Sequence, residues 1–446
     1  TLLLNNNQQT VHSWEHDRGP ASMPYLIQGN DPGLENAILV YPYRVPNPTM
    51  DSGGVGGGVQ LVDWNSNVLW DFVLSNEEYQ HHHDVQPMPN GNILMIAWER
   101  FEQNEWQQMG RISVDNAFNE MWATAILEID PNNSQVVWEW HIWDHMVQEI
   151  GPEYEATYGN IEDYPELMHL NEGNVGNGDG PGTANADWIH CNAIDYNETL
   201  DQIVLSSRFM SEIYIIDHST TTEEAASHEG GNCGKGGDIL YRWGNPQIYN
   251  RGDNGDQILD DQHSVNWISE GYPGEGNLIL FNNRHQGNQS AGLEFSPPLM
   301  EDGNYTLLGT QPYGPEEPTW VYHPGQGWHT NVQGGAFRLP NGNTLLTVCD
   351  DADIYEVTYE GEVVWNYHHT GNNVMIPRAQ KYAIDAFDQE IILGDINGDE
   401  ILNVLDVILI VNMALGINDI DLNGDMNGDG GINVLDIVLL VNIILS

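Results

Sequence analysis

The sequence predicts an all-β fold, a six-bladed β-propeller with five or seven blades as alternatives, followed by a small α-helical module. Two short hydrophobic units alternate along the first part of the chain, and two acidic loops stand 30 residues apart near its end. The 47 glycines and 22 prolines favour many turns over long helices. We therefore divide the 446 residues into a propeller (1–385), a short connector (386–394) and a C-terminal module (395–446).

The first unit is a hairpin whose second strand ends in tryptophan. Its copies are Gln60–Trp70, Ile126–Trp138 and Ile354–Trp365, with a shortened relative, Asp238–Trp243, that follows Ile213–Asp217. Apolar and polar residues alternate around an Asn- or Gly-containing turn, which is typical of a β-hairpin. We expect the four tryptophans to be blade core rather than ligand platforms.

The second unit begins with histidine and ends in a strand that follows a turn. The four copies begin at His83, His190, His263 and His329. Together the two units make one four-stranded sheet per repeat, and radially repeated sheets form a propeller. Strands near 37–40 and 59–62 raise the expected count to six blades. Innermost strands converge on a central channel, so we expect the four imidazoles there, with Arg208 and Arg284 at the ends of neighbouring strands.

The charge of the chain is extreme, because 12 Lys and Arg oppose 66 Asp and Glu, for a net charge of −54. Such a surface repels nucleic acids and anionic membranes. It requires counter-ions, and Ca²⁺ is the natural one outside cells, although adaptation to salty water explains the same composition.

A start at Thr1 without Met is typical of a processed chain, so we expect a secreted or cell-surface protein. The three cysteines, Cys191, Cys233 and Cys349, allow at most one disulfide and indicate no compartment.

The two acidic loops have the spacing of calcium ligands. Each places oxygen-bearing side chains at positions 1, 3, 5, 9 and 12, with a backbone carbonyl at position 7, as a hard cation requires. The first set is Asp395, Asn397, Asp399, Ile401 (carbonyl), Asn403 and Asp406; the second is Asp425, Asn427, Asp429, Gly431 (carbonyl), Asn433 and Asp436. Apolar helical stretches follow at 404–415 and 434–445, both too short to span a bilayer. Asp406 and Asp436 would lie in first helical turns, where negative charge is favourable.

Residues 393–446 resemble a pair of type I dockerin repeats. The resemblance implies two bound calcium ions and docking to a cohesin-type partner. Val404-Leu405 and Val434-Leu435 are apolar where many dockerins carry small hydroxylated residues. This departure favours a more hydrophobic contact, with a cohesin-like domain or another copy of this chain as the partner.

The histidine and arginine positions suggest chemistry at the propeller centre. Several imidazoles with an arginine suit a tetrahedral oxyanion such as sulfate or phosphate. A neutral imidazole can also act as a nucleophile, and a second one as an acid or base.

Histidines at repeat positions can instead hydrogen-bond the next blade, above all His329. A metal site at His81-His82-His83 is less favoured, because neighbours on a strand point to opposite faces. Gly53–Gly58 lacks the Lys and helix of a phosphate-binding loop, so we interpret it as an ordinary loop.

Residues 1–385, including Val11-His-Ser-Trp14, resemble the arylsulfotransferase propeller family that works without 3′-phosphoadenosine phosphosulfate. The motifs are His83, His190-Cys-Asn192, Ser206-Ser-Arg208 and His263. The resemblance implies that His263 is a transiently sulfurylated nucleophile. It implies that His83 and His190 hold or protonate the aryl oxygen, Arg208 binds sulfuryl oxygens and Asn192 orients a neighbour. The implied reaction moves a sulfuryl group from a phenolic sulfate to a phenol by two displacements, with no nucleotide cofactor.

Two other functions remain open on the sequence alone. A non-catalytic extracellular subunit would self-assemble into a fibre or layer through the C-terminal module and the segment Thr1–Val11, which can add as a strand to a neighbour's sheet edge. A carbohydrate- or sulfate-binding propeller would instead deliver a partner enzyme.

Overall fold

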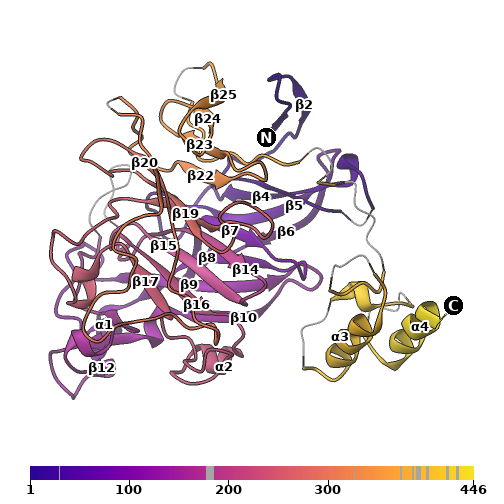
Figure 1. Ribbon diagram of the computed structural model, residues 1–446. Coiled ribbons are helices and arrows are strands. Elements are labelled where there is room, and N and C mark those ends of the chain that lie inside the picture. Colours follow the sequence, from indigo (N-terminus) through magenta and orange to yellow (C-terminus); the bar gives the residue numbers. More distant parts are fainter. Residues whose placement is uncertain are drawn as a thin grey trace.

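Five four-stranded antiparallel sheets surround a common centre in the computed structural model (Figure 1). The structure describes residues 1–446 except 30, 177–184, 326, 372–373, 384–385, 388–392, 398–400, 418–420, 428–430 and 446, and except the side chain of Leu422. The first strands of four successive sheets contact one another in chain order, β7 (Tyr79–Pro87) with β14 (Cys191–Asn197), β14 with β18 (His263–Trp267) and β18 with β22 (Gly335–Arg338). The remaining sheet contacts β7 through β4 (Ile38–Arg44) and β5 (Gly57–Val62), an arrangement that makes each sheet a propeller blade.

Each blade runs from an innermost to an outermost strand in sequence order. Blade 1 consists of β3 (Tyr25–Ile27), β4 (Ile38–Arg44), β5 (Gly57–Val62) and β6 (Val68–Val73). Blade 2 consists of β7 (Tyr79–Pro87), β8 (Ile93–Phe101), β9 (Met121–Asp130) and β10 (Gln135–His141). Blade 3 consists of β14 (Cys191–Asn197), β15 (Gln202–Ser207), β16 (Glu212–Asp217) and β17 (Tyr241–Trp243). Blade 4 consists of β18 (His263–Trp267), β19 (Leu278–Asn282), β20 (Ala291–Phe295) and β21 (Trp320–Tyr322). Blade 5 consists of β22 (Gly335–Arg338), β23 (Thr344–Val348), β24 (Asp353–Val357) and β25 (Val363–His368).

Smaller elements decorate the propeller. The strands outside the blades are β1 (Leu2–Leu4), β2 (Thr10–Ser13), β11 (Met146–Gln148), β12 (Thr157–Tyr158) and β13 (Met168–His169). The helices of the propeller region are α1 (Gln103–Met109), α2 (Thr222–Ala225) and the 3-10 turns η1 (Leu34–Asn36), η2 (Ile142–Asp144), η3 (Ile161–Asp163) and η4 (Pro246–Tyr249). The two predicted sequence units are visible in blade 2, where the histidine unit supplies β7 and β8 and the tryptophan hairpin supplies β9 and β10.

The described residues contain five such sheets, so the expected count of six blades is not confirmed and the alternative of five is the one observed. The strands near 37–40 and 59–62, which raised the expected count, pair with each other as β4 and β5 of one blade. They therefore add no further sheet.

The two ends of the propeller sequence meet between blades 5 and 1. Strand β1 pairs with β2 of the same chain, and Gln8 in the hairpin turn donates to the carbonyl of Asn366 on β25 at 2.7 Å. The segment predicted to reach a neighbouring molecule is thus paired internally here. Residues 374–382 border the same junction and carry Arg378, which is buried and paired with Asp84 of β7. A largely apolar cavity of about 560 Å³ lies between these segments.

The core combines apolar blades with a polar centre. Trp138 and Trp243 are buried as predicted, whereas Trp70 and Trp365 on the outer strands of blades 1 and 5 are only half-buried. Residues 81–84 of β7, three histidines and an aspartate, are at most 2% exposed. Buried polar groups cost free energy unless they are hydrogen-bonded. Such a cluster at the blade centre therefore points to a functional site.

The C-terminal helices lie beside the propeller rather than in it (Figure 1). They are α3 (Val404–Ala414) and α4 (Val434–Leu445), which pack against each other, with η5 (Leu422–Gly424) between them. Among the described residues, no helix is both long enough and apolar enough to cross a membrane.

Candidate active site

Three of the four predicted histidines come together at the propeller centre. His83 lies in β7, His190 immediately precedes β14 and His263 is the first residue of β18. The rings of His83 and His190 meet edge to face, with centroids 4.5 Å apart. Both residues have φ near +55°, a conformation that costs a non-glycine residue free energy and is concentrated at functional sites.

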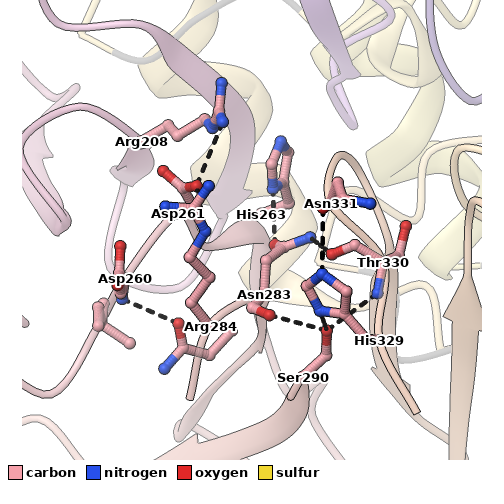
Figure 2. A network of polar contacts seen from close by, with 12 residues as sticks. Arg208, Asp260, Asp261, His263, Asn283, Arg284, Ser290, His329, Thr330 and Asn331 are labelled. Atoms are coloured by element: carbon pink, nitrogen blue, oxygen red, sulfur yellow. Dashed lines mark hydrogen bonds and ion pairs between the residues drawn. The ribbon is translucent and has the colours of Figure 1, made fainter. Parts of the chain in front are cut away.

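His329 is the exception. It lies in the loop that precedes β22, which begins six residues later at Gly335. Its Nδ1 is 3.3 Å from the hydroxyl of Ser290, and its Nε2 is 3.2 Å from the amide oxygen of Asn331 (Figure 2). The prediction that His329 starts an innermost strand is therefore wrong, because this repeat inserts a loop between the histidine and the strand.

His263 is held as a neutral imidazole with both ring nitrogens hydrogen-bonded. Its Nδ1 donates to Oδ1 of Asn283 at 2.8 Å (Figure 2). The amide nitrogen of Asn283 donates to the carbonyls of Thr330 and Gln333 at 3.0 and 2.8 Å, which orients Oδ1 toward the ring. The lone pair therefore lies on Nε2, where it accepts a 3.2 Å hydrogen bond from the backbone of Gln333. Burial, followed by the positive charge of Arg208, lowers the pKa of His263 to about 3.

His190 is paired with a carboxylate that the sequence did not reveal. Its Nδ1 is 2.5 Å from Oδ2 of Asp187, whose Oδ1 accepts a 3.0 Å hydrogen bond from the indole of Trp98. The ring also stacks on Phe209 with centroids 4.5 Å apart. A carboxylate on Nδ1 fixes the tautomer and the orientation of the ring, which leaves Nε2 to exchange protons.

His82 was also missed, because strand neighbours were expected to face opposite sides. The pairing of β7 with β8 shifts register between His81 and Val85, and this bulge turns His82 and His83 toward each other. Their Nδ1 atoms are 2.8 Å apart, and His82 stacks on Trp98 at 4.1 Å. Burial, followed by the charge of His190, lowers the pKa of both imidazoles well below the ordinary value.

The glycine-rich segment 53–58 packs over these histidines. A Cβ on Gly54 would lie 2.1 Å from the ring of His83, and one on Gly56 would lie 2.6 Å from Nδ1 of His81. The backbone amide of Gly57 donates to that same Nδ1 at 3.0 Å. Residues 53–56 form a loop as predicted, whereas Gly57 and Gly58 begin β5. The glycines allow the backbone to approach the imidazoles closely.

The two arginines share one carboxylate. Oδ2 of Asp261 lies 3.2 Å from Nη2 of Arg208 and 3.0 Å from Nε of Arg284 (Figure 2). The Arg208 side chain is 8% exposed and that of Arg284 is 46% exposed, so they form an inner and an outer cation. Asp260 also interacts with both arginines and adds a second carboxyl group to the cluster. The planar guanidinium of the inner cation suits an anionic group.

Asn192 connects blade 3 to the strand that carries His263. Its amide nitrogen donates to the carbonyl of Gln262 at 2.8 Å. Its Oδ1 is buried without a hydrogen-bond partner in the part of the chain that the structure describes, and so is the hydroxyl of Ser264. Buried polar atoms are rarely left unpaired, so these two indicate that a water molecule or ligand completes the site.

The C-terminal loops repeat one hydrogen-bond pattern. Oδ2 of Asp406 accepts the backbone amide of Asn403 at 2.8 Å, and Oδ2 of Asp436 accepts that of Asn433 at the same distance. Both carboxylates are fully buried within the first turns of α3 and α4. Asp399 and Asp429 lie outside the described residues. A buried carboxylate enclosed by an oxygen-rich loop fits a hard cation such as Ca²⁺.

The three cysteines show no redox or metal role. Cys191, Cys233 and Cys349 are buried free thiols. Burial raises the pKa of each to about 12, which leaves the unreactive thiol form at neutral pH.

Comparison with known proteins supplies a family. A family model described as Arylsulfotransferase (ASST) matches residues 62–296, more than half of the chain. No curated protein matches it. Similar solved structures include a protein of unknown function from Bacteroides caccae (11% identity, 84% of this chain and 92% of that chain, TM-score 0.42). Another is the WD40 domain of Toxoplasma gondii coronin (8% identity, 83% of this chain and 73% of that chain, TM-score 0.33). A third is a virginiamycin B lyase from Staphylococcus aureus (9% identity, 79% of this chain and 75% of that chain, TM-score 0.34). At these TM-scores none of the three bears on function.

Proposed function

Because this chain belongs to the arylsulfotransferase (ASST) family, we propose that it transfers a sulfuryl group from a phenolic sulfate to a phenol through a covalent intermediate on His263. The observation that carries the proposal is the state of that imidazole. Its Nδ1–H is held by Asn283, and its low pKa keeps Nε2 unprotonated at neutral pH. A buried, neutral imidazole with an oriented lone pair is a ready nucleophile.

In the first half-reaction, the amide of Gln333 releases Nε2 of His263, the freed lone pair attacks sulfur, and the bond from sulfur to the aryl oxygen breaks. The departing phenolate takes a proton from Nε2 of His190, whose imidazolium form is stabilised by Asp187. The sulfurylated ring of His263 becomes more positive, so its hydrogen bond to the oxygen of Asn283 strengthens at that stage.

In the second half-reaction, an acceptor phenol returns a proton to Nε2 of His190 while its oxygen attacks sulfur. The bond between sulfur and Nε2 of His263 breaks, which restores the neutral imidazole. We assign Arg208 to the sulfuryl oxygens, since a guanidinium stabilises the negative charge that they carry in both transition states. His83, in edge-to-face contact with His190, is assigned to the aryl oxygen, and Asn192 positions the strand of His263.

The test is release of a coloured phenol from 4-nitrophenyl sulfate with phenol as the acceptor and Ca²⁺ present. His263→Ala should abolish turnover, by about 10³-fold or more for a nucleophile. His368→Ala is the matched control, because His368 is an exposed histidine on the outermost strand of blade 5. Full turnover by the His263→Ala variant would refute the nucleophile, and no turnover by folded wild-type protein would refute the activity with this donor.

We further propose that the C-terminal module binds two calcium ions and docks onto a partner outside the cell. Bound Ca²⁺ would neutralise the clustered oxygen ligands of the two loops and hold them closed. The strongly acidic composition supports an extracellular setting rich in such cations.

An exposed apolar face supports the docking role and favours the alternative, a non-catalytic structural subunit. Equivalent residues of the two helices are exposed to nearly the same extent: Val404 and Val434 (64% and 66%), Leu405 and Leu435 (53% and 58%), and Ile408 and Val438 (50% each). Exposed apolar patches mark interaction sites. We propose a cohesin-like domain or another copy of this chain as the partner. Light scattering with and without chelator distinguishes them, since self-association in purified protein that chelator reverses requires the second copy.

A further inference from the structure

A cluster of two histidines and an aspartate lies at the outer edge of the propeller, away from the central site. His145 follows η2 at the end of blade 2, whereas His228 and Asp238 lie at the two ends of the loop between α2 and β17 of blade 3. Three potential ligand atoms, one from each residue, are within 4.8 Å of one another. Figure 1 shows α2 at this edge beside β10.

The loop is constructed so that its two ends meet at His145. The backbone amide of Gly237 donates to the carbonyl of Ser227 at 3.0 Å, which places the following Asp238 beside His228. A Cβ on Gly237 would lie 2.6 Å from Nε2 of His145 and 2.0 Å from the carbonyl of Ala225. Glycine at 237 is therefore what lets the imidazole reach this carbonyl.

If both histidines are neutral, there are too few hydrogens to satisfy every contact in this cluster. Oδ1 of Asp238 lies 2.7 Å from Nδ1 of His145 and 2.7 Å from Nδ1 of His228. Nε2 of His145 lies 2.8 Å from the carbonyl of Ala225, which only accepts, so Nε2 carries the hydrogen. Nδ1 of His145 therefore faces the carboxylate oxygen at a distance that either a proton or a metal ion between the two atoms satisfies.

From this arrangement we propose that His145, His228 and Asp238 form a Zn²⁺ site. The site uses Nδ1 of His145 with Nε2–H bound to a carbonyl, which is the usual outer contact of a metal-bound imidazole. Two imidazole nitrogens and one carboxylate oxygen suit zinc, whereas Ca²⁺ prefers oxygen ligands alone. His145 and Asp238 are buried, and the side chain of His228 is 52% exposed, so a fourth, open position faces water.

Zinc requires only a small adjustment of this geometry. Tetrahedral ligands about 2.0–2.1 Å from the metal stand about 3.3 Å apart, compared with 2.7 Å here. The exposed His228 can move with its loop, and the Asp238 carboxylate must rotate away from Nδ1 of His145 to lengthen the second contact. The bound ion would join the loop of blade 3 to the end of blade 2 and so act as a clamp between adjacent blades.

The test uses the full chain, stripped with chelator, returned to Ca²⁺ and titrated with Co²⁺ as a visible probe for zinc. One Co²⁺ per chain should give the intense visible absorption of a tetrahedral site, and Zn²⁺ should displace it. His228→Ala, at an exposed position, should weaken binding at least about 100-fold, beyond the 10–100-fold that loss of an outer contact costs. His368→Ala is the matched control, because His368 pairs with Asp353 at the same 2.7 Å but lacks a second histidine.

Asp238→Asn provides a second variant that should fold. Its amide can donate to a lone pair on Nδ1, so the fold no longer needs a cation while a ligand is lost. It should bind no Co²⁺ at concentrations that saturate the wild type. Absence of visible absorption in the wild type would overturn the proposal, because a proton then bridges these groups. Absorption that survives in His228→Ala, or intense near-ultraviolet bands from a cysteine ligand, would place the metal elsewhere and overturn it equally.

Discussion

His263 and Asn283 are joined by a 2.8 Å hydrogen bond in which Nδ1 of the imidazole donates to the amide oxygen. The two residues stand on either side of the β18–β19 hairpin of blade 4, His263 at its start and Asn283 just past its end. This bond determines which nitrogen of His263 carries the lone pair, and therefore which nitrogen would receive the sulfuryl group in the proposed transfer.

Replacing Asn283 should impair the proposed transfer without removing the nucleophile. In Asn283→Ala the tautomer and orientation of His263 are no longer held, so we expect kcat with 4-nitrophenyl sulfate to fall about 10–100-fold with little change in KM. Asn331→Ala, which removes an exposed amide beside His329, is the control and should retain activity. Equal losses in both variants would show that the effect is only local disorder.

Asp187 should matter as a positioning residue for His190. Asp187→Asn keeps the size of the side chain but exchanges an acceptor for a donor, which favours the wrong tautomer of His190. By analogy with carboxylate–histidine pairs in serine proteases, kcat should drop by up to about 10⁴-fold. The decisive readout is the split between kcat and KM, because loss of positioning lowers kcat and leaves KM nearly unchanged. An unchanged kcat would remove Asp187 from the mechanism.

Gly54 tests the close packing over His83. Gly54→Ala adds a methyl group 2.1 Å from the ring at a residue with φ of +77°, so we expect loss of both stability and activity. Gly91→Ala is the matched control, because Gly91 has φ of +85° but open space around it. The control should lose only about 1 kcal/mol of stability from backbone strain and keep its activity. Similar behaviour of the two variants would show that packing against His83 is unimportant.

The free energy of unfolding should be largest near neutral pH. Burial lowers the pKa of His81 to about 4, and burial with the charge of Arg208 lowers that of His263 to about 3. The unfolded state, with histidines near pH 6.5, then binds more protons, so stability falls as the pH drops from about 6.5 toward 3. Against the effect of burial, hydrogen bonds to Asp201 and Glu128 raise the pKa of His218 to about 9. Its contribution is present below pH 6.5 and is lost as the pH rises through 9.

Urea unfolding at several pH values, with Ca²⁺ held constant, measures both limbs. His218→Gln should flatten the alkaline limb and leave the acidic one in place. A wild-type stability that is independent of pH between about 4 and 7 would contradict the buried, neutral state of the central histidines.

Calcium removal should act on the C-terminal module alone. Without the cation, the carboxylates of each loop repel one another, so we expect α3 and α4 to lose helical circular dichroism in chelator. The comparison is made by returning Ca²⁺, because the chelator also removes the zinc proposed at His145, His228 and Asp238. Returned Ca²⁺ should restore the helices without affecting how the five blades unfold. Asp436→Ala should reduce the calcium stoichiometry from two to one, and a stoichiometry that stays at two would remove Asp436 from the ligand set.

The recurring strands were predictable because their signal is local. The alternation from Gln60 to Trp70 and from Ile126 to Trp138 records which face of each strand is buried, and the structure contains those hairpins. The grouping of His83, His190 and His263 was also predictable, since repeats place equivalent residues near the propeller centre, although His83 lies within β7 rather than at its start. The first helical turns at Asp406 and Asp436 followed from loop spacing in the same way.

Tertiary structure alone decided the partners of these residues. The bulge between His81 and Val85 turns His82 into the cluster, and no periodicity in the sequence marks it. Asp187 lies three residues from His190, Asn283 lies 20 residues from His263, and Asp238 lies 93 residues from His145, and no repeat in the sequence marks any of these pairings. The physical reason is that alternating hydrophobicity specifies which face of a strand is buried. The proton state and orientation of each imidazole are set by whichever carboxylate, amide or carbonyl the folded chain brings within hydrogen-bond distance.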